Sequence, residues 1–183
     1  MKVDELPIEG LRLIKLAIKS DERGFFAETF RATDFAAMGL PTDFAQDNHS
    51  RSAPGVLRGL HYQATPLQGK LIGVAHGRMW DAVADLRPSS PTYGRSYGME
   101  LNDQDGKLIY IPPGVAHGFC VIGHEPADAV YKLTAEYNPA SDKGILWNDP
   151  DLAVDWPIRV PILSARDKLL PTFAEYRKDP AFA

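Results

Sequence analysis

The segment GVLRGLHYQ, residues 55–63, places Arg58 and His61 three positions apart in a run that otherwise reads as a buried strand. A guanidinium suits phosphate oxygens, and a histidine can exchange a proton near neutral pH. Strand alternation would put the two side chains on opposite faces, unless Gly59 introduces a bulge that turns one of them. The alternatives are an edge strand with Arg58 in solvent and His61 in the core, or one pocket that holds both.

Further polar residues fall in segments that read as neighbouring strands. Strand interiors accept such groups when they line a water-filled or ligand-filled cavity, because unpaired buried charges are costly. An arginine fork suits phosphate, whereas a lysine is better placed to stabilise one developing oxyanion. For Lys70 alone, a solvated surface lysine is the alternative. The segments DERGFFAETF, FAQDNHSRS and QGK contain this set: Arg23, Glu28, Gln46, Asn48, His49 and Lys70.

The segment YIPPGVAHGF raises the question of a metal. Its spacing of proline, glycine and His117 resembles the second half-motif of the cupin barrel, in which a turn presents a histidine to the interior. The first half-motif needs two histidines and a nearby carboxylate, but the run HYQATPLQ offers only His61 and Gln63. Two imidazoles and an amide make a poor divalent-ion site, so we expect no metal and no cofactor. His117 could instead donate a hydrogen bond to an anionic ligand, or pack against Phe119.

Two tyrosines and one aspartate complete the candidate residues. Tyr131 lies in a predicted strand within VYKLTAEYNP, where a phenol facing a cavity could donate a proton. Tyr137 stands where that strand gives way to a loop, and its ring could stack on a base or a sugar. Either tyrosine could equally be core or rim packing. Asp167, in SARDKLLP, could orient a histidine ring if the fold brings the two together.

Composition predicts one all-β domain, residues 1–183. Of the 183 residues, 44% are hydrophobic, and 15 prolines and 15 glycines separate short segments. A net charge of −4 offers no general attraction for nucleic acid or an anionic membrane. The single Cys120 excludes an intrachain disulfide and suits a reducing compartment. The opening MKVDELPIEG lacks the apolar core of a signal peptide, so we expect a cytoplasmic protein.

Short segments rich in β-branched and aromatic residues recur at the spacing typical of sandwiches and barrels. The predicted strands are Leu11–Ile18, Phe25–Phe30, Asp43–Ser50, Gly55–Gln63, Lys70–Ala75, Arg78–Leu86, Ser96–Leu101, Lys107–Ile111, His117–Val121 and Ala129–Thr134. A short helix is predicted from an N-cap at Thr33 or Asp34 to Gly39. The tail after Trp147 should wrap the core irregularly, with a terminal helix near Phe173–Lys178. A two-sheet jelly roll is the predicted architecture.

Together these segments resemble the dTDP-4-dehydrorhamnose 3,5-epimerase family, whose members act on nucleotide-linked 4-keto-6-deoxy sugars. No GxGxxG, GxxxxGK[ST], GxSxG or HExxH pattern indicates a different chemistry. The resemblance implies a double-stranded β-helix of the cupin (jelly-roll) type with short peripheral helices. The matches follow the family's order across almost the whole chain: DERGFFAETF, FAQDNHSRS, GVLRGLHYQ, QGKL, DLRPSSPTYG, IPPGVAHGF, VYKLTAEYNP and GILWNDPDLAVDWP.

The resemblance implies a role for each candidate residue. His61 would be the general base, oriented by Asp167, and Tyr131 would deliver a proton to the opposite face. Lys70 would stabilise the enolate at the C4 oxygen. The implied substrate-binding residues are Arg23, Arg58 and His117 for the diphosphate, Glu28, Gln46 and Asn48 for the nucleotide, Phe26 and Tyr137 for stacking on thymine, and Asp142 and Arg166, where the family often has a glutamate and a lysine, for other polar contacts.

The leading hypothesis is an epimerase that needs no cofactor and inverts C3 and C5 of dTDP-4-dehydro-6-deoxy-D-glucose, giving dTDP-4-dehydro-L-rhamnose. One alternative is a mono-epimerase acting at C3 or C5 only, or an epimerase of another nucleotide-linked 4-keto sugar. The others are a metal-dependent cupin isomerase or oxygenase and a non-catalytic sugar-nucleotide binding module. The resemblance also implies a homodimer whose N-terminal strands cross between subunits, placing Arg23, Phe26 and Glu28 in the partner's pocket.

Overall fold

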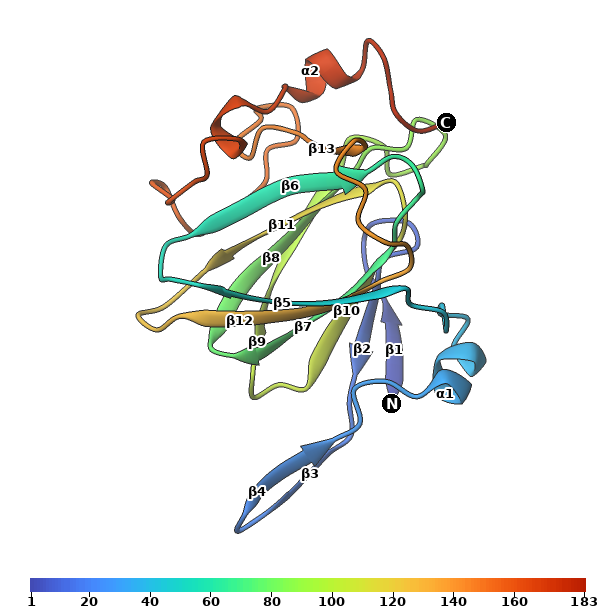
Figure 1. Ribbon diagram of the computed structural model, residues 1–183, viewed down its shortest axis with the longest axis vertical. Helices are drawn as coiled ribbons and strands as arrows, with labels where there is room; N and C mark the ends of the chain where they lie inside the picture. The colour runs from blue at the N-terminus through green and yellow to red at the C-terminus, as the bar shows by residue number, and fades with distance from the viewer.

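Two antiparallel sheets face each other and form a jelly roll (Figure 1). The computed structural model describes all residues, 1–183. The six-stranded sheet has the order β1-β2-β10-β7-β12-β5, and the five-stranded sheet has the order β13-β6-β11-β8-β9. Their strands are β1 (Lys2–Glu5), β2 (Arg12–Lys15), β5 (Gln46–Ser52), β6 (Leu57–Gln63), β7 (Lys70–His76), β8 (Arg78–Asp85), β9 (Ser96–Asn102), β10 (Lys107–Ile111), β11 (Val115–Val121), β12 (Ala127–Leu133) and β13 (Asp142–Gly144). The predicted all-β jelly roll is confirmed, whereas the single domain stays a prediction.

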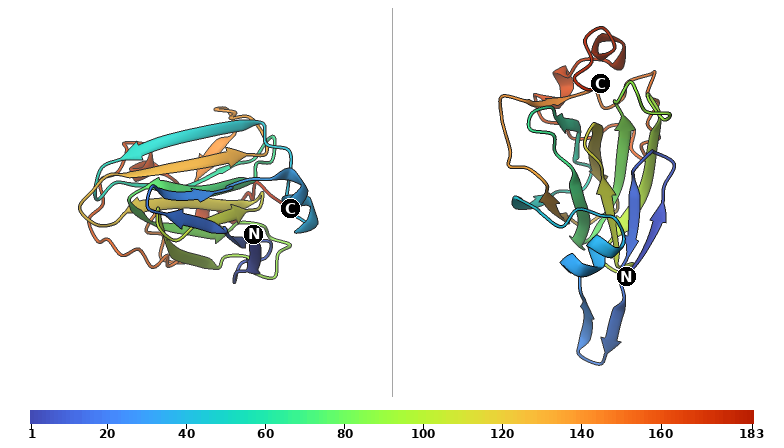
Figure 2. Two further views of the ribbon diagram at one scale, coloured as in Figure 1. Left: turned by 90° about the horizontal axis from the view of Figure 1, so that it is seen from below. Right: turned by 90° about the vertical axis from the view of Figure 1, so that its right-hand side faces the viewer.

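The remaining elements lie outside the two sheets. The hairpin of β3 (Ile18–Asp21) and β4 (Gly24–Ala27) projects from one end of the molecule (Figures 1 and 2). Helix α1 (Ala32–Ala37) packs on the six-stranded sheet, and the C-terminal tail, with η1 (Asp167–Leu169) and α2 (Phe173–Tyr176), covers the other. The predicted irregular tail with a terminal helix is therefore confirmed. No helix has the length and apolar character needed to span a bilayer.

Alternation along the strands decides which side chains reach the space between the sheets. In β7, Ile72 belongs to the inner core, while its neighbour Leu71 packs outwards in a cluster with Phe35 of α1. In β6, Leu60 and Tyr62 pack outwards against the C-terminal tail. Because these two face out, the residue between them, His61, faces the space between the sheets.

Several predicted strands have different bounds in the structure. The single strand expected over residues 11–18 is divided, since β2 ends at Lys15 and β3 begins at Ile18. The strand expected from Asp43 begins only at Gln46. Strands β1 and β13 were not predicted, because KVDE and DKG have no apolar pattern. Pairing with β2 and β6, rather than local propensity, holds these two in place.

Helix α1 begins earlier than predicted. Its N-cap is Arg31, not Thr33 or Asp34, and the Arg31 side chain pairs with Glu28 instead of capping the helix. Phe35 is fully buried in the outer cluster, so tertiary packing sets the position of the helix and overrides the cap preference.

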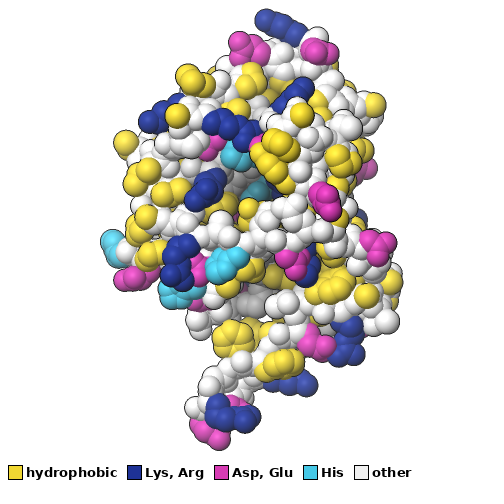
Figure 3. Space-filling view, viewed as in Figure 1, with side chains coloured by type: hydrophobic (Ala, Val, Ile, Leu, Met, Phe, Trp, Pro, Cys, Tyr) yellow, Lys and Arg dark blue, Asp and Glu magenta, His cyan; other side chains and the backbone are white.

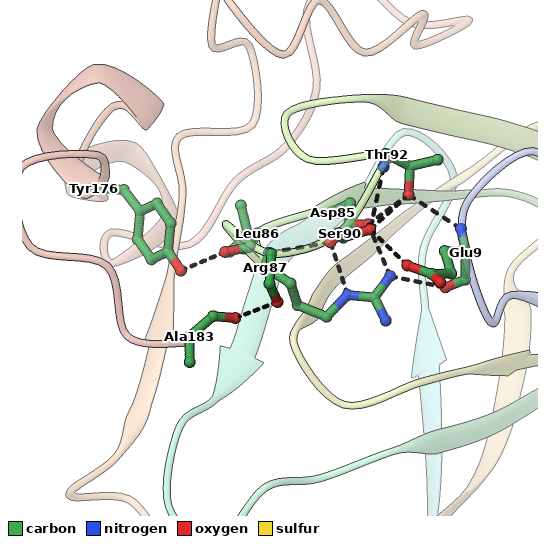
Figure 4. Close-up of polar contacts among 9 residues, drawn as sticks. Glu9, Asp85, Leu86, Arg87, Ser90, Thr92, Tyr176 and Ala183 are labelled. Atoms are coloured by element: carbon green, nitrogen blue, oxygen red, sulfur yellow. Dashed lines mark hydrogen bonds and ion pairs between the residues drawn. The ribbon is translucent and has the colours of Figure 1, made fainter.

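The motif DLRPSSPT forms a hydrogen-bond network at the end of β8 (Figure 4). This network connects the N-terminal loop to the barrel. Asp85 is fully buried and accepts hydrogen bonds from Arg87 Nε at 2.8 Å, Ser90 Oγ at 2.6 Å and Thr92 Oγ1 at 2.6 Å. Arg87 Nη2 also donates to the backbone oxygen of Glu9 at 2.7 Å. A buried carboxylate with this many donors is satisfied, so the motif is structural and lies outside the site described below.

Candidate active site

The inner face of the barrel gathers the candidate catalytic residues in one cavity of about 480 Å³. His61 comes from β6 and Lys70 from β7, while Tyr131 comes from β12. His61 and Tyr131 stand on different sheets, so they approach the cavity from opposite walls. The space-filling view shows this hollow, with histidine side chains inside it and basic side chains at its edge (Figure 3).

A bulge in β6 turns Arg58 and His61 to the same side. Opposite them, β11 pairs Phe119 with Arg58 and His117 with His61, so three steps along β6 match two along β11. Gly59 has a φ of +132°, and a Cβ there would lie 2.5 Å from the Gly118 Cα. Only glycine accepts both conditions. The pocket that holds both side chains is therefore the correct alternative, and the bulge at Gly59 is the reason.

His61 forms a close pair with the aspartate predicted to orient it. Its Nε2 lies 2.6 Å from Asp167 Oδ1, although the two residues are 106 positions apart in the chain. Burial alone would raise the pKa of Asp167, but hydrogen bonds from His61 and Ser164 outweigh it and hold that pKa below its usual range. Asp167 is thus a carboxylate at neutral pH, and it can fix which nitrogen of His61 holds the proton.

Lys70 lines the same cavity next to His61. Its Nζ donates to the backbone oxygen of His61 at 3.3 Å. Burial lowers the pKa of Lys70 to about 8, against the opposing charges of Asp142 and Asp81. The alternative of a solvated surface lysine is wrong. A cation this close to His61 can stabilise negative charge that develops on a substrate oxygen.

His117 is a buried strand residue and not part of a turn. Its Nε2 lies 2.7 Å from Asp81 Oδ2, and its ring is tilted against Phe119 with centroids 6.3 Å apart. Burial lowers the pKa of His117, although Asp81 opposes the shift. Asp81 is the functional candidate that sequence reasoning missed. The available signal was its place in MWDAVAD, where strand alternation puts Asp81 on the same inner face as the apolar Met79 and Val83.

The cavity has a basic lining. Arg58, Lys70 and Arg166 contribute three cations to its wall, against the single carboxylate of Asp167. Arg58 Nε donates to Ser52 Oγ at 3.0 Å and leaves its remaining N–H groups free of protein partners. The net charge of the whole chain is −4, so the local excess of positive charge is specific to this cavity and suits an anionic ligand.

A chain of polar contacts leads away from Arg166, which lines the cavity. Asp142 Oδ2 accepts from Arg166 Nη1 at 2.6 Å and from the Tyr137 hydroxyl at 3.1 Å. Gln46 accepts from the backbone N–H of Tyr137 at 2.8 Å and donates to Asn48 Oδ1 at 2.8 Å. These five predicted binding residues therefore lie next to one another. Tyr137 is 54% exposed, so its ring is accessible to a ligand.

Three predicted binding residues do not reach this cavity within one chain. Arg23 and Phe26 belong to the projecting β3–β4 hairpin, and Glu28 follows it (Figure 1). Arg23 pairs with Asp21 at 2.5 Å, Glu28 pairs with Arg31, and Phe26 is 62% exposed. The structure thus separates these residues from His61, as expected if they serve a neighbouring subunit.

The chain does not supply a metal site at the cupin position. Nowhere do three His, Cys, Asp or Glu side chains come together as a possible ion cage. Gln63, which stands where a second ligand would be needed, donates to the backbone oxygens of Pro66 and Glu136 at 3.0 Å and accepts from the Asn138 N–H at 2.7 Å. Both N–H groups and the oxygen of its amide are held by backbone partners, and no carboxylate completes an ion cage with the two histidines, so these residues do not fit a metal-dependent cupin.

The inner cavity of this jelly roll combines a His–Asp pair, a lysine, a tyrosine and a basic lining. These features define a cupin-fold enzyme that is suited to proton transfer on an anionic substrate. Residues 5–175 match the dTDP-4-dehydrorhamnose 3,5-epimerase family. The chain belongs to this family.

Individual relatives agree with that assignment. The dTDP-4-dehydrorhamnose 3,5-epimerase of Pseudomonas aeruginosa is 44% identical over 96% of this chain and 97% of its own length. The enzyme of the same name from Neisseria gonorrhoeae is 42% identical over 97% of this chain, which spans 54% of that longer relative. A crystal structure of the Legionella pneumophila dTDP-6-deoxy-D-glucose-3,5-epimerase in complex with dTDP-4-keto-L-rhamnose has a TM-score of 0.90 and 41% identity, covering 94% of this chain and 93% of the other.

Proposed function

We propose that this protein inverts C3 and C5 of dTDP-4-dehydro-6-deoxy-D-glucose and so forms dTDP-4-dehydro-L-rhamnose. The observation that supports this most is the His61–Asp167 pair, which faces Tyr131 across a basic cavity beside Lys70. Two opposed proton-transfer groups are what inversion of a carbon centre requires. The bound nucleotide sugar of the Legionella relative supports the choice of substrate class.

In the proposed reaction, the C4 ketone acidifies the hydrogens on C3 and C5. Asp167 accepts the Nε2–H of His61, which leaves Nδ1 free to remove a proton from the carbon. The electron pair of the broken C–H bond moves to the C4 oxygen, and the Lys70 ammonium stabilises the resulting enolate. Tyr131 then returns a proton to the other face of the same carbon. The same removal and return of a proton at the second carbon completes the product. The sugar is neither oxidised nor reduced overall.

Binding is assigned to the remaining residues. Arg58 and His117 meet the diphosphate, and Tyr137 stacks on the thymine while Gln46 and Asn48 hold its polar edge. Asp142 and Arg166 form an ion pair, and Arg166 contributes its charge to the cavity wall.

Proton NMR of dTDP-4-keto-6-deoxyglucose with the protein in D2O tests the function. We expect deuterium to enter at both C3 and C5 and the product to have the L-rhamno configuration. A spectrum with exchange at only one of these positions contradicts the double inversion and indicates a mono-epimerase, which could use the same base and acid.

The activity should fall as the pH rises through about 8. Lys70 has a pKa lowered to about 8, so its ammonium is charged below that pH and is lost above it. The measurement is kcat/KM against pH for the wild type and for Lys70→Arg, which stays charged throughout. In Lys70→Arg the alkaline fall should move upwards or disappear. An unchanged alkaline limb in this variant would assign the fall to another group.

We also propose a homodimer in which the β3–β4 hairpin reaches the partner's cavity. Phe25 and Phe26 are each 62% exposed on this hairpin, and a two-stranded ribbon is only marginally stable when it has no packing partner. In this arrangement Phe26 supplies a second stacking surface for the base, while Arg23 adds a cation and Glu28 a polar contact.

Mixing two inactive variants tests the exchange of hairpins. Arg23→Glu and His61→Ala should each be inactive as homodimers. After joint unfolding and refolding, mixed dimers should regain activity, because one of their two cavities combines an intact Arg23 with an intact His61. A mixture that stays inactive, although both variants form dimers by sedimentation, shows that the hairpin serves its own chain.

A further inference from the structure

A second His–Asp pair lies beneath the cavity and has no part in the proton transfers assigned above. Asp81 is in β8, and its side chain is 0% exposed. Its Oδ2 lies 2.7 Å from His117 Nε2, while its Oδ1 has no hydrogen-bond partner. The pair therefore joins a buried carboxylate to a histidine that lines the cavity.

Packing alone does not explain an aspartate at this position. Met79 and Val83, two residues to either side in β8, both belong to the apolar core between the sheets. An apolar residue would suit the same face, and a carboxylate with one unpaired oxygen is costly to bury. Such a group is more readily explained by what it does to its one partner, His117.

The register fixes how the two side chains meet. Across β8 and β11, Asp81 is opposite Phe119, and His117 is opposite Val83, so the aspartate and the histidine are diagonal neighbours on the inner face. The contact uses Nε2 of the ring. The other nitrogen, Nδ1, has no protein partner and is not sealed from solvent. It is the atom available to a ligand.

The available nitrogen of a neutral His117 has the wrong polarity for a phosphate. When Nε2–H donates to Asp81, Nδ1 holds a lone pair and can only accept. Phosphate oxygens also only accept at neutral pH, so His117 contacts them productively after it takes up a second proton at Nδ1. A carboxylate on the far side of the ring stabilises that doubly protonated form.

We propose that Asp81 is a positioning residue for ligand binding: it holds His117 by Nε2, turns Nδ1 to the cavity, and lets the ring gain a proton when a diphosphate enters. This inference rests on the proposed function for the nature of the ligand. It adds that binding is coupled to proton uptake.

The charges around His117 favour a neutral ring in the free protein and a protonated ring when the ligand is bound. Burial lowers the pKa of the ring and keeps it neutral in the free protein, with Lys70 and His61 acting in the same direction and Asp81 opposing them. The negative charges of a diphosphate offset the burial effect and the nearby cations. The ionisable groups that face His117 or line the same cavity are Asp81 from β8, Lys70 from β7, Arg58 and His61 from β6, Tyr131 from β12, and Arg166 and Asp167 from the tail.

Calorimetric titration with dTDP, in buffers of different ionisation enthalpy near pH 7.5, measures the proton uptake. The wild type should take up protons on binding. Asp81→Asn should bind dTDP about tenfold more weakly, the typical effect of one charged hydrogen bond, and should lose the uptake. Its KM should rise more than its kcat falls. Asp128→Asn is the matched control, because Asp128 is a buried carboxylate paired with a histidine, His49, outside the cavity.

Nitrogen NMR of the histidine rings in the wild-type protein gives a reading that does not depend on a variant folding. His117 should be protonated at Nε2 alone in the free protein and at both nitrogens with dTDP bound. A free ring protonated at Nδ1, or a ring that stays neutral in the complex, overturns the inference. Failure of the proposed function looks different, because deuterium from D2O then fails to enter at C3 or at C5, whereas failure of this inference alone leaves exchange at both carbons and dTDP binding intact without proton uptake.

Discussion

Replacing His61 with alanine is expected to lower turnover by about a thousandfold or more, within the range found for removal of a general base. The expected loss follows from geometry. Asp167 occupies Nε2 of His61, and both residues line the cavity, so Nδ1 is the ring nitrogen that remains for a substrate. Deuterium exchange at C3 and C5 should disappear together with inversion, because both begin with removal of a carbon-bound proton. Affinity for dTDP should change little, since the diphosphate contacts are assigned to other residues.

Two further variants sharpen the test of His61. Asp167→Asn keeps the shape of the partner but can donate to Nε2, which would move the ring proton to Nδ1 and block the base, so it should also lower turnover by at least about a hundredfold. His76→Ala is the control, because His76 pairs with Asp103 at 3.7 Å on the exposed surface. If His61→Ala retained exchange at either carbon, a different base would have to be sought.

The sequence allowed much of this site to be predicted, because short motifs hold most of its residues. GVLRGLHYQ and QGK indicated a ligand cavity, and the recurring short segments rich in β-branched and aromatic residues placed Lys70 and Tyr131 in strands. Whether Arg58 and His61 share a face could not be decided from the sequence. That depends on a bulge at Gly59, which forms because the Gly118 backbone approaches it.

Contacts between distant segments were the harder part. Asp167 reaches His61 because the C-terminal tail folds back over the outer face of the five-stranded sheet, where Phe173 and Tyr176 are buried. No local pattern encodes that path. Asp81 was missed for a related reason: a single aspartate in an apolar strand does not show its partner, and His117 is 36 positions away. Long-range pairing, rather than propensity, decides both cases.

Replacing Tyr131 with phenylalanine should separate proton exchange from inversion. The variant keeps His61, Asp167 and Lys70, so a carbon-bound proton is still removed and the enolate is still stabilised. The group that returns a proton to the opposite face is missing, and the base can only give one back to the face from which it came. We therefore expect deuterium to enter the substrate with its configuration retained, while formation of the inverted product falls by about a hundredfold or more.

Exchange that continues while inversion is lost shows that Tyr131 acts as an acid. A residue needed only for packing would not have this effect. Tyr97→Phe is the matched control, because Tyr97 is likewise partly buried and packs against the same inner core, from β9. The control should exchange and invert as the wild type does. If Tyr131→Phe lost exchange and inversion equally, the phenol would be needed before the proton leaves carbon, for example to orient the ketone. If it lost neither, water or another group would deliver the second proton, and the opposed pair of His61 and Tyr131 would no longer explain inversion.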